Sequence, residues 1–302
     1  MLWILIILLI AFAVREGIHR KTAYYQITHV PYFRVRRNLG RYGEYLTYRY
    51  LREYEKEGAK FLFNLYIPKG ENGTTEIDVL MISSNGLFIF ESKNYSGWIF
   101  GSEHQPKWYQ TLPQGRGRSH KESFYNPIMQ NRTHIRHLKV LVGDTIPMHS
   151  IIAFSDRCTL KNVQVTSSDI HVINRGEVMD VVASICSNAC AALSEEQIQG
   201  FYDLLYPYTQ ADTTVREKHI EDIEKMVHCE TDKLSAMPVP SQTTEEISLE
   251  QIAVQPEQEA TPLQCPRCGG ALVLRTAKKG SNVGNRFYGC SNFPKCRYIR
   301  NI

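Results

Sequence analysis

The sequence predicts an α/β fold in which a mixed β-sheet is flanked by helices. Short apolar runs at 61–67, 75–82 and 87–93 are typical of buried strands. Apolar residues at helical spacing precede these runs at 41–57 and follow them at 127–142. Strands enclosed between helices indicate a sheet whose faces are covered by helices. A chain of 302 residues has room for one such domain and for small additional modules.

A tight turn joins two of the apolar runs. Asn85 and Gly86 tolerate the positive φ angles of a short hairpin, so 75–82 and 87–93 are expected to pair antiparallel. The remaining expected elements are strands at 98–101 and 108–112, which can extend this sheet, strands at 151–154 and 171–173, and helices at 178–190, 194–206 and 213–226.

A continuous apolar run, Leu2–Val14, opens the chain. It is shorter than the roughly 20 residues that cross a bilayer comfortably, but aromatic and basic flanks can accommodate a short span. No Lys or Arg precedes the run, whereas Arg15, Arg20 and Lys21 follow it, which orients the following chain toward the cytoplasm. We therefore expect residues 1–21 to form a single-pass transmembrane helix in the inner (cytoplasmic) membrane. The alternatives are a cleaved signal peptide and a buried helix.

Charge is balanced over the whole chain, at a formal net +4, but it is unevenly distributed. From Cys265 to the end there are eight Lys and Arg residues and no Asp or Glu. This favours an anionic partner such as a phosphate backbone, although the basic residues can also serve only to solubilise the module. Acidic residues, Pro, Gln and Thr dominate 230–263. Residues 211–263 are therefore expected to form a charged helix and a flexible acidic linker.

Two acidic side chains and a lysine are expected to converge at the end of the sheet. Residues two apart in a strand point to the same face, so Glu91 and Lys93 project together. Asp78 lies on the neighbouring strand, across the hairpin turn. Carboxylate oxygens suit Mg²⁺, which activates water for phosphodiester hydrolysis while a lysine stabilises the developing charge. The alternative is a solvated ion pair of little energetic consequence.

Several motifs occur in order between Gly40 and about Leu205. They are Gly43-Glu44, Glu76-Ile77-Asp78-Val79-Leu80, the run from Gly86 to Tyr95, Gly97, Gly101, Trp108, and Asn126-Pro127 with Gln130-Asn131. Together they resemble the NERD, or nuclease-related, domain family. The resemblance implies a restriction-endonuclease-like PD-(D/E)xK fold for residues 22–210. It also implies that Asp78 and Glu91 bind Mg²⁺, that Lys93 is the catalytic lysine, and that Glu44 and Gln130 support the site. Ile77 stands where many nucleases of this fold have proline.

Other polar and aromatic residues of this segment have two interpretations each. His134 and His137 are three apart on the helix 127–142, and we expect them on its solvated face rather than as a metal pair. Three aromatic residues are expected to pack in the core rather than to stack on bases, namely Trp98, Trp108 and Tyr109. Four basic residues either contact phosphates or lie in an ordinary solvated loop, namely Arg116, Arg118, His120 and Lys121.

Four cysteines near the end of the chain have the spacing of a zinc ribbon. Cys265 and Cys268 form one pair, and Cys290 and Cys296 follow. Four thiolates are the number that closes a structural Zn²⁺ site. A module as short as 264–302 cannot support itself by its core alone, so zinc is expected to drive its folding. The alternative is a tail with free or disulfide-bonded cysteines.

The residues around these cysteines resemble a known zinc finger. Cys-Pro-Arg-Cys-Gly-Gly from 265 and Arg-Phe-Tyr-Gly-Cys-Ser-Asn-Phe-Pro-Lys-Cys from 286 are similar to the C-terminal finger of bacterial type I topoisomerases. The resemblance implies binding of single-stranded DNA. Aromatic faces amid basic residues suit stacking on bases, although some of the aromatics must pack the small core. The candidate DNA-binding residues are Arg286, Phe287, Tyr288, Phe293, Lys295, Arg297 and Tyr298.

These features predict a membrane-anchored protein that hydrolyses DNA in a Mg²⁺-dependent reaction. A zinc finger with structural Zn²⁺ is expected to bind DNA, and no small-molecule cofactor is expected. One alternative is a non-catalytic protein that binds or tethers DNA on a nuclease-like fold. Another makes RNA the substrate. The complete set of Asp78, Glu91 and Lys93 favours the enzyme.

Overall fold

The computed structural model describes residues 2–70, 73–115, 118–219, 221, 265–276, 286–292, 295–296 and 298–301. Contacts divide the chain into two compact units, Met1–Pro238 and Val239–Ile302, and each is described by itself. The expected acidic linker, 230–263, lies outside the described residues.

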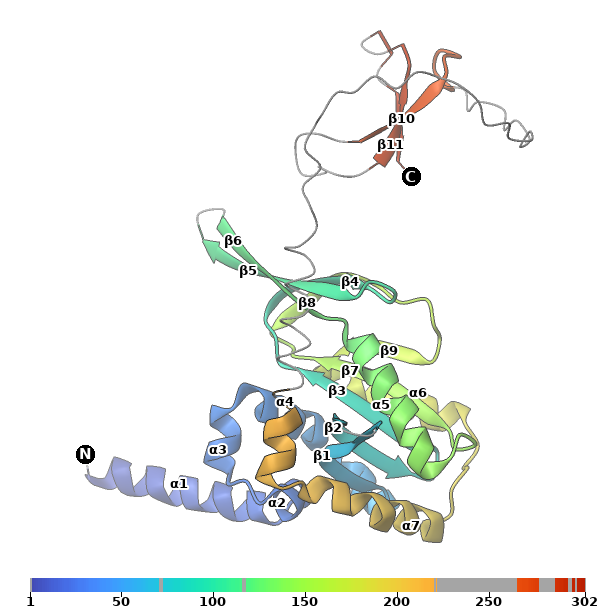
Figure 1. Ribbon diagram of the computed structural model, residues 1–302. Helices are drawn as coiled ribbons and strands as arrows, with labels where there is room; N and C mark the ends of the chain where they lie inside the picture. Colours follow the sequence, from blue (N-terminus) through green and yellow to red (C-terminus); the bar gives the residue numbers. More distant parts are fainter. Residues whose placement is uncertain are drawn as a thin grey trace. The chain divides into compact units, whose positions relative to one another are not determined.

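The main sheet of the larger unit has five strands in the order β1-β2-β3-β7-β9 (Figure 1). The first three strands are antiparallel, whereas β7 and β9 continue the sheet in parallel. The prediction of a mixed sheet with flanking helices is therefore confirmed. The strand bounds are β1 Lys60–Lys69, β2 Gly73–Ser83, β3 Gly86–Lys93, β7 Met148–Phe154 and β9 Ile170–Asn174.

The β2–β3 hairpin depends on a glycine. Ser83 pairs with Gly86 at the turn, and Gly86 has a φ of 114°. A Cβ atom at this position would lie 2.3 Å from the carbonyl oxygen of Pro147. A side chain would therefore be strained by its backbone conformation and blocked by a neighbouring chain segment.

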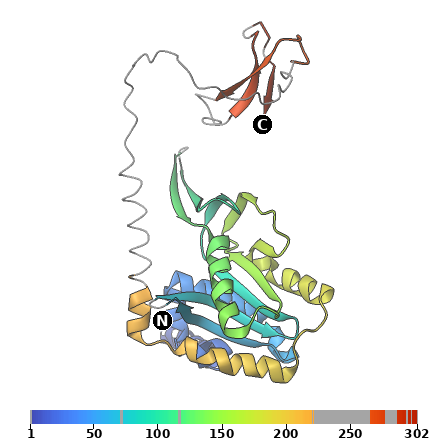
Figure 2. The ribbon, with the colours of Figure 1, turned by 45° about the vertical axis from the view of Figure 1, so that its right-hand side comes forward.

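Helices cover both faces of the main sheet (Figures 1 and 2). Gly43 of α4 lies against Ser92, since a Cβ there would be 3.0 Å from the Ser92 hydroxyl, while His134 of α5 contacts Glu91. Adjacent strand residues point to opposite faces, so α4 and α5 lie on opposite sides of β3. The principal helices are α4 Leu39–Leu51, α5 Pro127–Val142, α6 Val178–Asn188 and α7 Glu195–Leu205.

The start of α5 is encoded locally. The Asn126 side chain accepts a hydrogen bond from the Ile128 amide, and Pro127 occupies the first helical turn, where no amide donor is needed. Asn126 also donates to the carbonyls of Ser102, Glu103 and Gln105. The helix is thereby fixed to the preceding chain with its first turn beside the end of β3.

Several short elements were not predicted. Tyr24 of α2 packs under β1, where it forms an aromatic cluster with Tyr48 of α4 and Phe63 of β1. A short segment such as α2 becomes helical because this packing stabilises it. These elements are α2 Ala23–Thr28, α3 Tyr32–Arg37 and the 3₁₀ helices η2 Arg175–Glu177 and η3 Tyr206–Gln210. The predicted helix 41–57 ends in a further 3₁₀ helix, η1 Arg52–Glu57.

The prediction of a membrane-spanning segment is wrong. The N-terminal helix is α1, Leu2–Arg20, and among the described helices none is both long enough and apolar enough to cross a bilayer. The last turns of α1 are instead engaged by the domain. Glu16 accepts a hydrogen bond from the Tyr32 amide at 3.0 Å, and the buried His19 donates to the Val30 carbonyl at 2.9 Å. This finding contradicts the prediction of a single-pass protein of the inner membrane with the bulk of its chain in the cytoplasm.

The segments 98–101 and 108–112 do not extend the main sheet. They belong to a second sheet with the strand order β6-β5-β4-β8, and Gly97, at a φ of 75° that favours glycine, begins β4. One face of this sheet packs on a separate apolar cluster that includes Ile99, Trp108 and Phe154. The bounds are β4 Gly97–Ser102, β5 Lys107–Gly115, β6 Arg118–Tyr125 and β8 Cys158–Gln164.

The smaller unit contains a three-stranded antiparallel sheet. Its strands are β10 Leu272–Thr276, β11 Arg286–Cys290 and β12 Ile299–Asn301. Gly289 and Cys290 are buried in this unit, and Leu272 and Tyr298 pack against the cluster of buried cysteines.

Candidate active site

Asp78 and Glu91 are the first residues beyond the end of the paired region of β2 and β3. The β2–β3 pairing ends at Val79 and Phe90, so the next residue on each strand is one of the two acids. Asp78 Oδ2 accepts a hydrogen bond from the Ser92 amide at 2.8 Å. The side chain thus holds β3 to β2 where the backbone ladder has stopped, and it brings both carboxylates to the same end of the sheet.

Glu91 is almost fully buried, at 1% exposure, and both of its oxygens have partners. Lys93 Nζ lies 2.5 Å from Glu91 Oε1, and His134 Nε2 donates to Glu91 Oε2 at 3.1 Å. Burial opposes ionisation of Glu91, but Lys93 and His134 outweigh it and hold its pKa below the usual value. Glu91 is therefore an ionised carboxylate with a fixed orientation.

Lys93 links β3 to the first turn of α5. Its ammonium donates to Gln130 Oε1 at 3.1 Å in addition to its contact with Glu91. Burial lowers the pKa of Lys93, whereas the Glu91 and Asp78 carboxylates raise it, and the net pKa lies above the usual value. Lys93 is therefore a permanently charged hydrogen-bond donor rather than a proton acceptor.

Glu44 reaches the same region from α4. It is 8% exposed, and its Oε2 accepts hydrogen bonds from Asn64 Nδ2 at 2.9 Å and from the Tyr24 hydroxyl at 3.4 Å. Burial raises the pKa of Glu44 to about 7, against the hydrogen bond from Asn64 and with the help of the Glu76 carboxylate. All five residues predicted for the site, Glu44, Asp78, Glu91, Lys93 and Gln130, thus surround one end of the β2–β3 pair.

The site brings together more carboxylates than ammonium groups. Burial, followed by Glu91 and Glu44, raises the pKa of Asp78 well above its usual value. Asp78 and Glu44 are thereby kept from full ionisation near neutral pH, and a cation bound beside them would offset the cost of their charge. Oxygen ligands in excess of nearby cations are the donor set that a hard divalent cation such as Mg²⁺ takes. The Asp78 and Glu91 carboxylates can hold such an ion.

Glu44 is expected to make the metal-free protein less stable as pH rises. Its folded pKa of about 7 exceeds the ordinary value of 4.5, so its stabilising contribution is fully present below pH 4.5 and is lost as pH rises through 7. Urea unfolding of the Mg²⁺-free protein across this range should show the loss, on the order of a few kcal/mol, in the wild type. The dependence on pH should be smaller in Glu44→Gln but not absent, because the raised pKa of Asp78 contributes a loss of the same sign. The exposed Glu217→Gln is the control and should keep the wild-type slope. An unchanged slope in Glu44→Gln would contradict the assignment.

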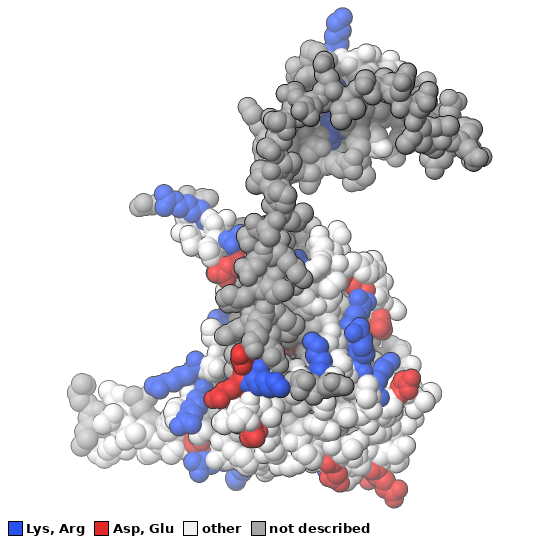
Figure 3. All heavy atoms as spheres, viewed as in Figure 1, with Lys and Arg blue, Asp and Glu red and all other residues white. Residues whose placement is uncertain are grey.

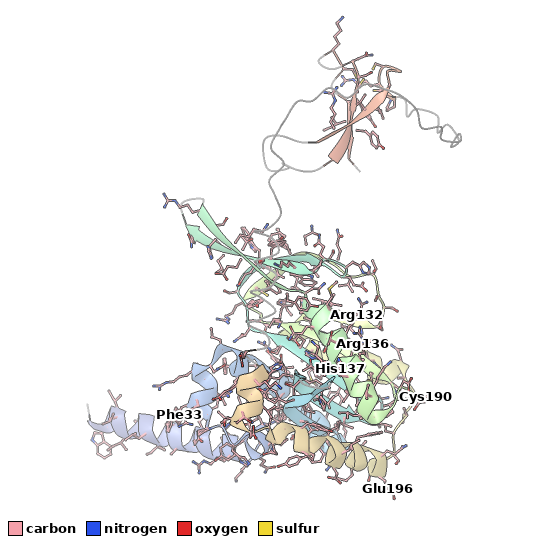
Figure 4. The ribbon with its side chains drawn as sticks, viewed as in Figure 1. Phe33, Arg132, Arg136, His137, Cys190 and Glu196 are labelled. Atoms are coloured by element: carbon pink, nitrogen blue, oxygen red, sulfur yellow. The ribbon has the colours of Figure 1, made fainter. Side chains whose placement is uncertain are left out.

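His134 is a site residue that the sequence interpretation missed. It was expected on a solvated helix face, yet it is 3% exposed and lies between Glu91 and Thr75, whose hydroxyl is 2.6 Å from His134 Nδ1. Its position four residues after Gln130 puts it one turn further along the same helix face, a signal that could have identified it. His137 has no contact with the site among the described interactions. Figure 4 labels it on α5 together with Arg132 and Arg136.

The four cysteines of the smaller unit form a zinc-binding site. Their Sγ atoms all lie within 4.8 Å of one another. Cys265 and Cys296 are separated by 3.8 Å and Cys268 and Cys290 by 3.3 Å, far beyond the roughly 2.05 Å of a disulfide. Four thiolates around one ion at Zn–S distances of about 2.3 Å would be separated by slightly less than 4 Å. The donor set and spacing therefore fit structural Zn²⁺.

Only part of the candidate DNA-binding set of the ribbon is described. Tyr298 is half-buried against the cysteines, Tyr288 is half-buried on β11, and Lys295 is exposed. Tyr298 therefore supports the small core with at least part of its ring. The side chains that lie outside the described part of the chain are those of Arg286, Phe287, Phe293 and Arg297.

Comparison with known proteins identifies the family of the larger unit. The model of the nuclease-related domain, NERD, matches residues 39–155. An uncharacterized protein of Bacillus anthracis is 31% identical over 193 residues, which are 64% of this chain and 85% of that protein. This chain belongs to the NERD family. No solved structure was found to match this NERD protein.

The ribbon of the NERD protein matches a second family model, the topoisomerase DNA binding C4 zinc finger, at residues 263–302. DNA topoisomerase 1 of Pyrococcus horikoshii is 51% identical over 43 residues, 13% of this chain. DNA topoisomerase 1 of Methanocaldococcus jannaschii is 46% identical over 57 residues, 19% of this chain. Each match spans 6% of the topoisomerase, so the similarity concerns the finger alone. The NERD protein thus combines a nuclease-related domain with a zinc finger of a DNA-binding type.

Proposed function

We propose that this NERD protein is a Mg²⁺-dependent nuclease that hydrolyses DNA phosphodiesters. The observation that carries the proposal is the convergence of Asp78, Glu91 and Lys93 at one end of the main sheet. The buried carboxylates would hold the ion, and the lysine beside them is the one group of the three that can donate to a phosphate oxygen. The zinc finger of a DNA-binding type makes DNA the favoured substrate.

Each residue has a separate task in this proposal. Asp78 and Glu91 would hold Mg²⁺, which when bound polarises the phosphate and makes a water molecule nucleophilic near neutral pH. Lys93 keeps its proton and directs it toward the attacking water or the phosphate oxygen on which charge develops. Glu91 and Gln130 fix the Lys93 ammonium, and His134 and Thr75 fix Glu91.

The ribbon would retain DNA while the larger unit cleaves it. Its basic composition favours the phosphate backbone, and its aromatic residues would favour single-stranded DNA, on whose bases aromatic rings can stack. Zn²⁺ serves only to fold the ribbon in this proposal, because four protein thiolates leave no open coordination position.

Incubation of the full-length protein with supercoiled plasmid and with circular single-stranded DNA tests the proposal. Reactions contain Mg²⁺, Mn²⁺ or a chelator. Cleavage that requires the metal supports the nuclease. Tight binding of DNA without cleavage in either metal would refute it and favour a protein that tethers DNA on a nuclease-like fold.

His134 is expected to act as a positioning residue for Glu91. His134→Ala removes one hydrogen bond to a carboxylate that would bind the metal, and loss of such a partner typically lowers activity about 10- to 100-fold. The Mg²⁺ concentration for half-maximal cleavage should rise, and high Mg²⁺ should restore part of the activity. A purely structural role for His134 would leave this concentration unchanged. His137→Ala, on the same helix and without a contact to Glu91, is the matched control.

A further inference from the structure

The second sheet has one packed face and one exposed face. Ile99 and Trp108 are fully buried in its apolar cluster, against which Phe124 also packs. Side chains alternate between the two faces of a strand, so the neighbours of these residues point the other way. Trp98 is 42% exposed and Tyr109 is 37% exposed. The expectation that Trp98, Trp108 and Tyr109 all pack in the core thus holds for Trp108 and is wrong for the other two.

Strand register shows which residues share the exposed face. Paired residues in neighbouring strands point to the same side, and three such rows cross the sheet. The rows are Trp98, Thr111 and Lys121, then Phe100, Tyr109 and Ser123, then Lys107 and Tyr125. We call this set, with Thr159 of β8, which pairs with Trp98, the aromatic face. Tyr125 is 50% exposed.

The charge of the aromatic face is positive. Lys107 and Lys121 belong to it, and none of its described strand residues is Asp or Glu. Glu122 points to the opposite side of β6, where it contacts His120. Lys121 Nζ lies 4.0 Å from the centre of the Tyr109 ring, so ammonium and aromatic groups are interleaved. Lys and Arg side chains are visible on the β5–β6 hairpin that projects from the domain (Figures 1 and 3).

A protein rarely leaves several large aromatic rings together in water without a partner for them. Rings that alternate with ammonium groups match a single-stranded nucleic acid, whose bases stack on the rings while its phosphates meet the cations. A duplex hides its base faces and would leave the rings unused. The described strand residues of this face include no carboxylate, so these residues do not repel a phosphate backbone.

The aromatic face is also close to the candidate active site along the chain. Trp98 follows Lys93 by five residues, and Gln130 follows Tyr125 by five. Five residues of extended chain span at most about 18 Å. A bound strand of a few nucleotides can therefore extend from this face to the end of β3.

We propose that the aromatic face of the β6-β5-β4-β8 sheet binds single-stranded DNA and is the substrate-binding surface of the NERD domain. The proposal rests on the proposed nuclease function for its choice of DNA. Binding at this face is separate from the chemistry, so the two can be tested separately.

Tryptophan fluorescence reports on this face within the full-length chain. The protein has three tryptophans, at positions 3, 98 and 108. Trp108 is fully buried, and the variant Trp3→Phe removes the other exposed ring. The experiment adds oligo(dT) to the double variant Trp3→Phe, Lys93→Ala. The buffer contains a weak chelator, which removes Mg²⁺ and leaves Zn²⁺ in the ribbon. The strand is then not cleaved, and stacking on Trp98 should quench its emission.

Tyr109 of β5 and Lys121 of β6 are tested on the aromatic face, and His120 on the opposite face of β6 provides the matched control. Tyr109→Ala and Lys121→Ala should each weaken the affinity measured by Trp98 quenching, about 5-fold or more for the loss of one stacked ring. Tyr109→Phe should retain it, because the ring remains. Lys121→Ala should also reduce the salt dependence of binding, by a slope of about 0.7 for one phosphate contact. His120→Ala, the neighbouring residue on the opposite face of β6, should bind as the parent does.

Each outcome bears on the proposal. Quenching by oligo(dT) that weakens in Tyr109→Ala and not in His120→Ala supports it. Fluorescein-labelled oligo(dT) that binds without quenching Trp98 overturns it and assigns binding to another surface, such as the ribbon. Equal quenching by duplex DNA, or none by any DNA, overturns it as well. Cleavage by the wild-type chain is measured separately, so a nuclease that binds DNA elsewhere is distinguished from an inactive protein with a working aromatic face.

Discussion

Lys93→Ala is expected to reduce metal-dependent DNA cleavage by about 100- to 1000-fold, the usual loss when one group that stabilises transition-state charge is removed. Lys93 is the ammonium between Glu91 and Gln130, and no other lysine or arginine among the described residues contacts either of them. Alanine therefore removes the donor and also leaves Glu91 without its ammonium partner. The initial rate of plasmid nicking at saturating Mg²⁺ measures the effect.

The controls separate a lost donor from a damaged fold. Lys56→Ala removes an exposed lysine that pairs with Glu53 on the surface, and it should cleave DNA at the wild-type rate. Asp78→Asn should lose activity as Lys93→Ala does, yet an amide oxygen at this position can still accept from the Ser92 amide. Both site variants should retain the wild-type circular dichroism spectrum. Full cleavage by Lys93→Ala would remove Lys93 from the proposed mechanism.

Cys290→Ser is expected to abolish stoichiometric zinc binding and to unfold the ribbon. Cys290 is 1% exposed and ends β11, directly beside the other three thiols. Zinc binding in small modules supplies about 10–16 kcal/mol, far more than the few apolar contacts of this unit, Leu272 and Tyr298 against the cysteines. Zinc content measured by mass spectrometry should fall from one ion per chain to none, and the ribbon should become sensitive to protease.

A second cysteine variant and the stability of the larger unit serve as controls for this prediction. Cys190→Ser changes an exposed cysteine of the larger unit and should leave both zinc content and protease resistance as they are. The larger unit of Cys290→Ser should unfold at the wild-type denaturant concentration, since the two units are separately packed. A ribbon that resists protease equally without zinc would show that its core suffices.

Features encoded by neighbouring residues were predicted well. Asn85 and Gly86 define a hairpin by their own backbone preferences, and Asn126 with Pro127 begins α5 at the predicted residue. Because the hairpin register follows from the turn, the position of Asp78 opposite the end of β3 could be counted from the sequence. The cysteine spacing likewise defines its own cluster.

Features that depend on distant contacts were not predicted. The apolar run of α1 resembled a membrane span because the sequence does not show that Glu16 and His19 bind the domain at Tyr32 and Val30. The strands β6 and β8 are largely polar and have no period that distinguishes them from loops. They form because β5 and β4 offer them open edges.

By itself, the sequence determined the α/β class, the central hairpin, the carboxylate–lysine set and the four cysteines, because each of these depends on residue types at fixed short spacing. Only the tertiary structure decided that 97–125 and β8 form a second sheet, that Trp108 is buried while Trp98 and Tyr109 are exposed, and that His134 completes the site around Glu91. The physical reason is that burial and hydrogen-bond partners are set by elements far apart in the chain, which local preferences do not record.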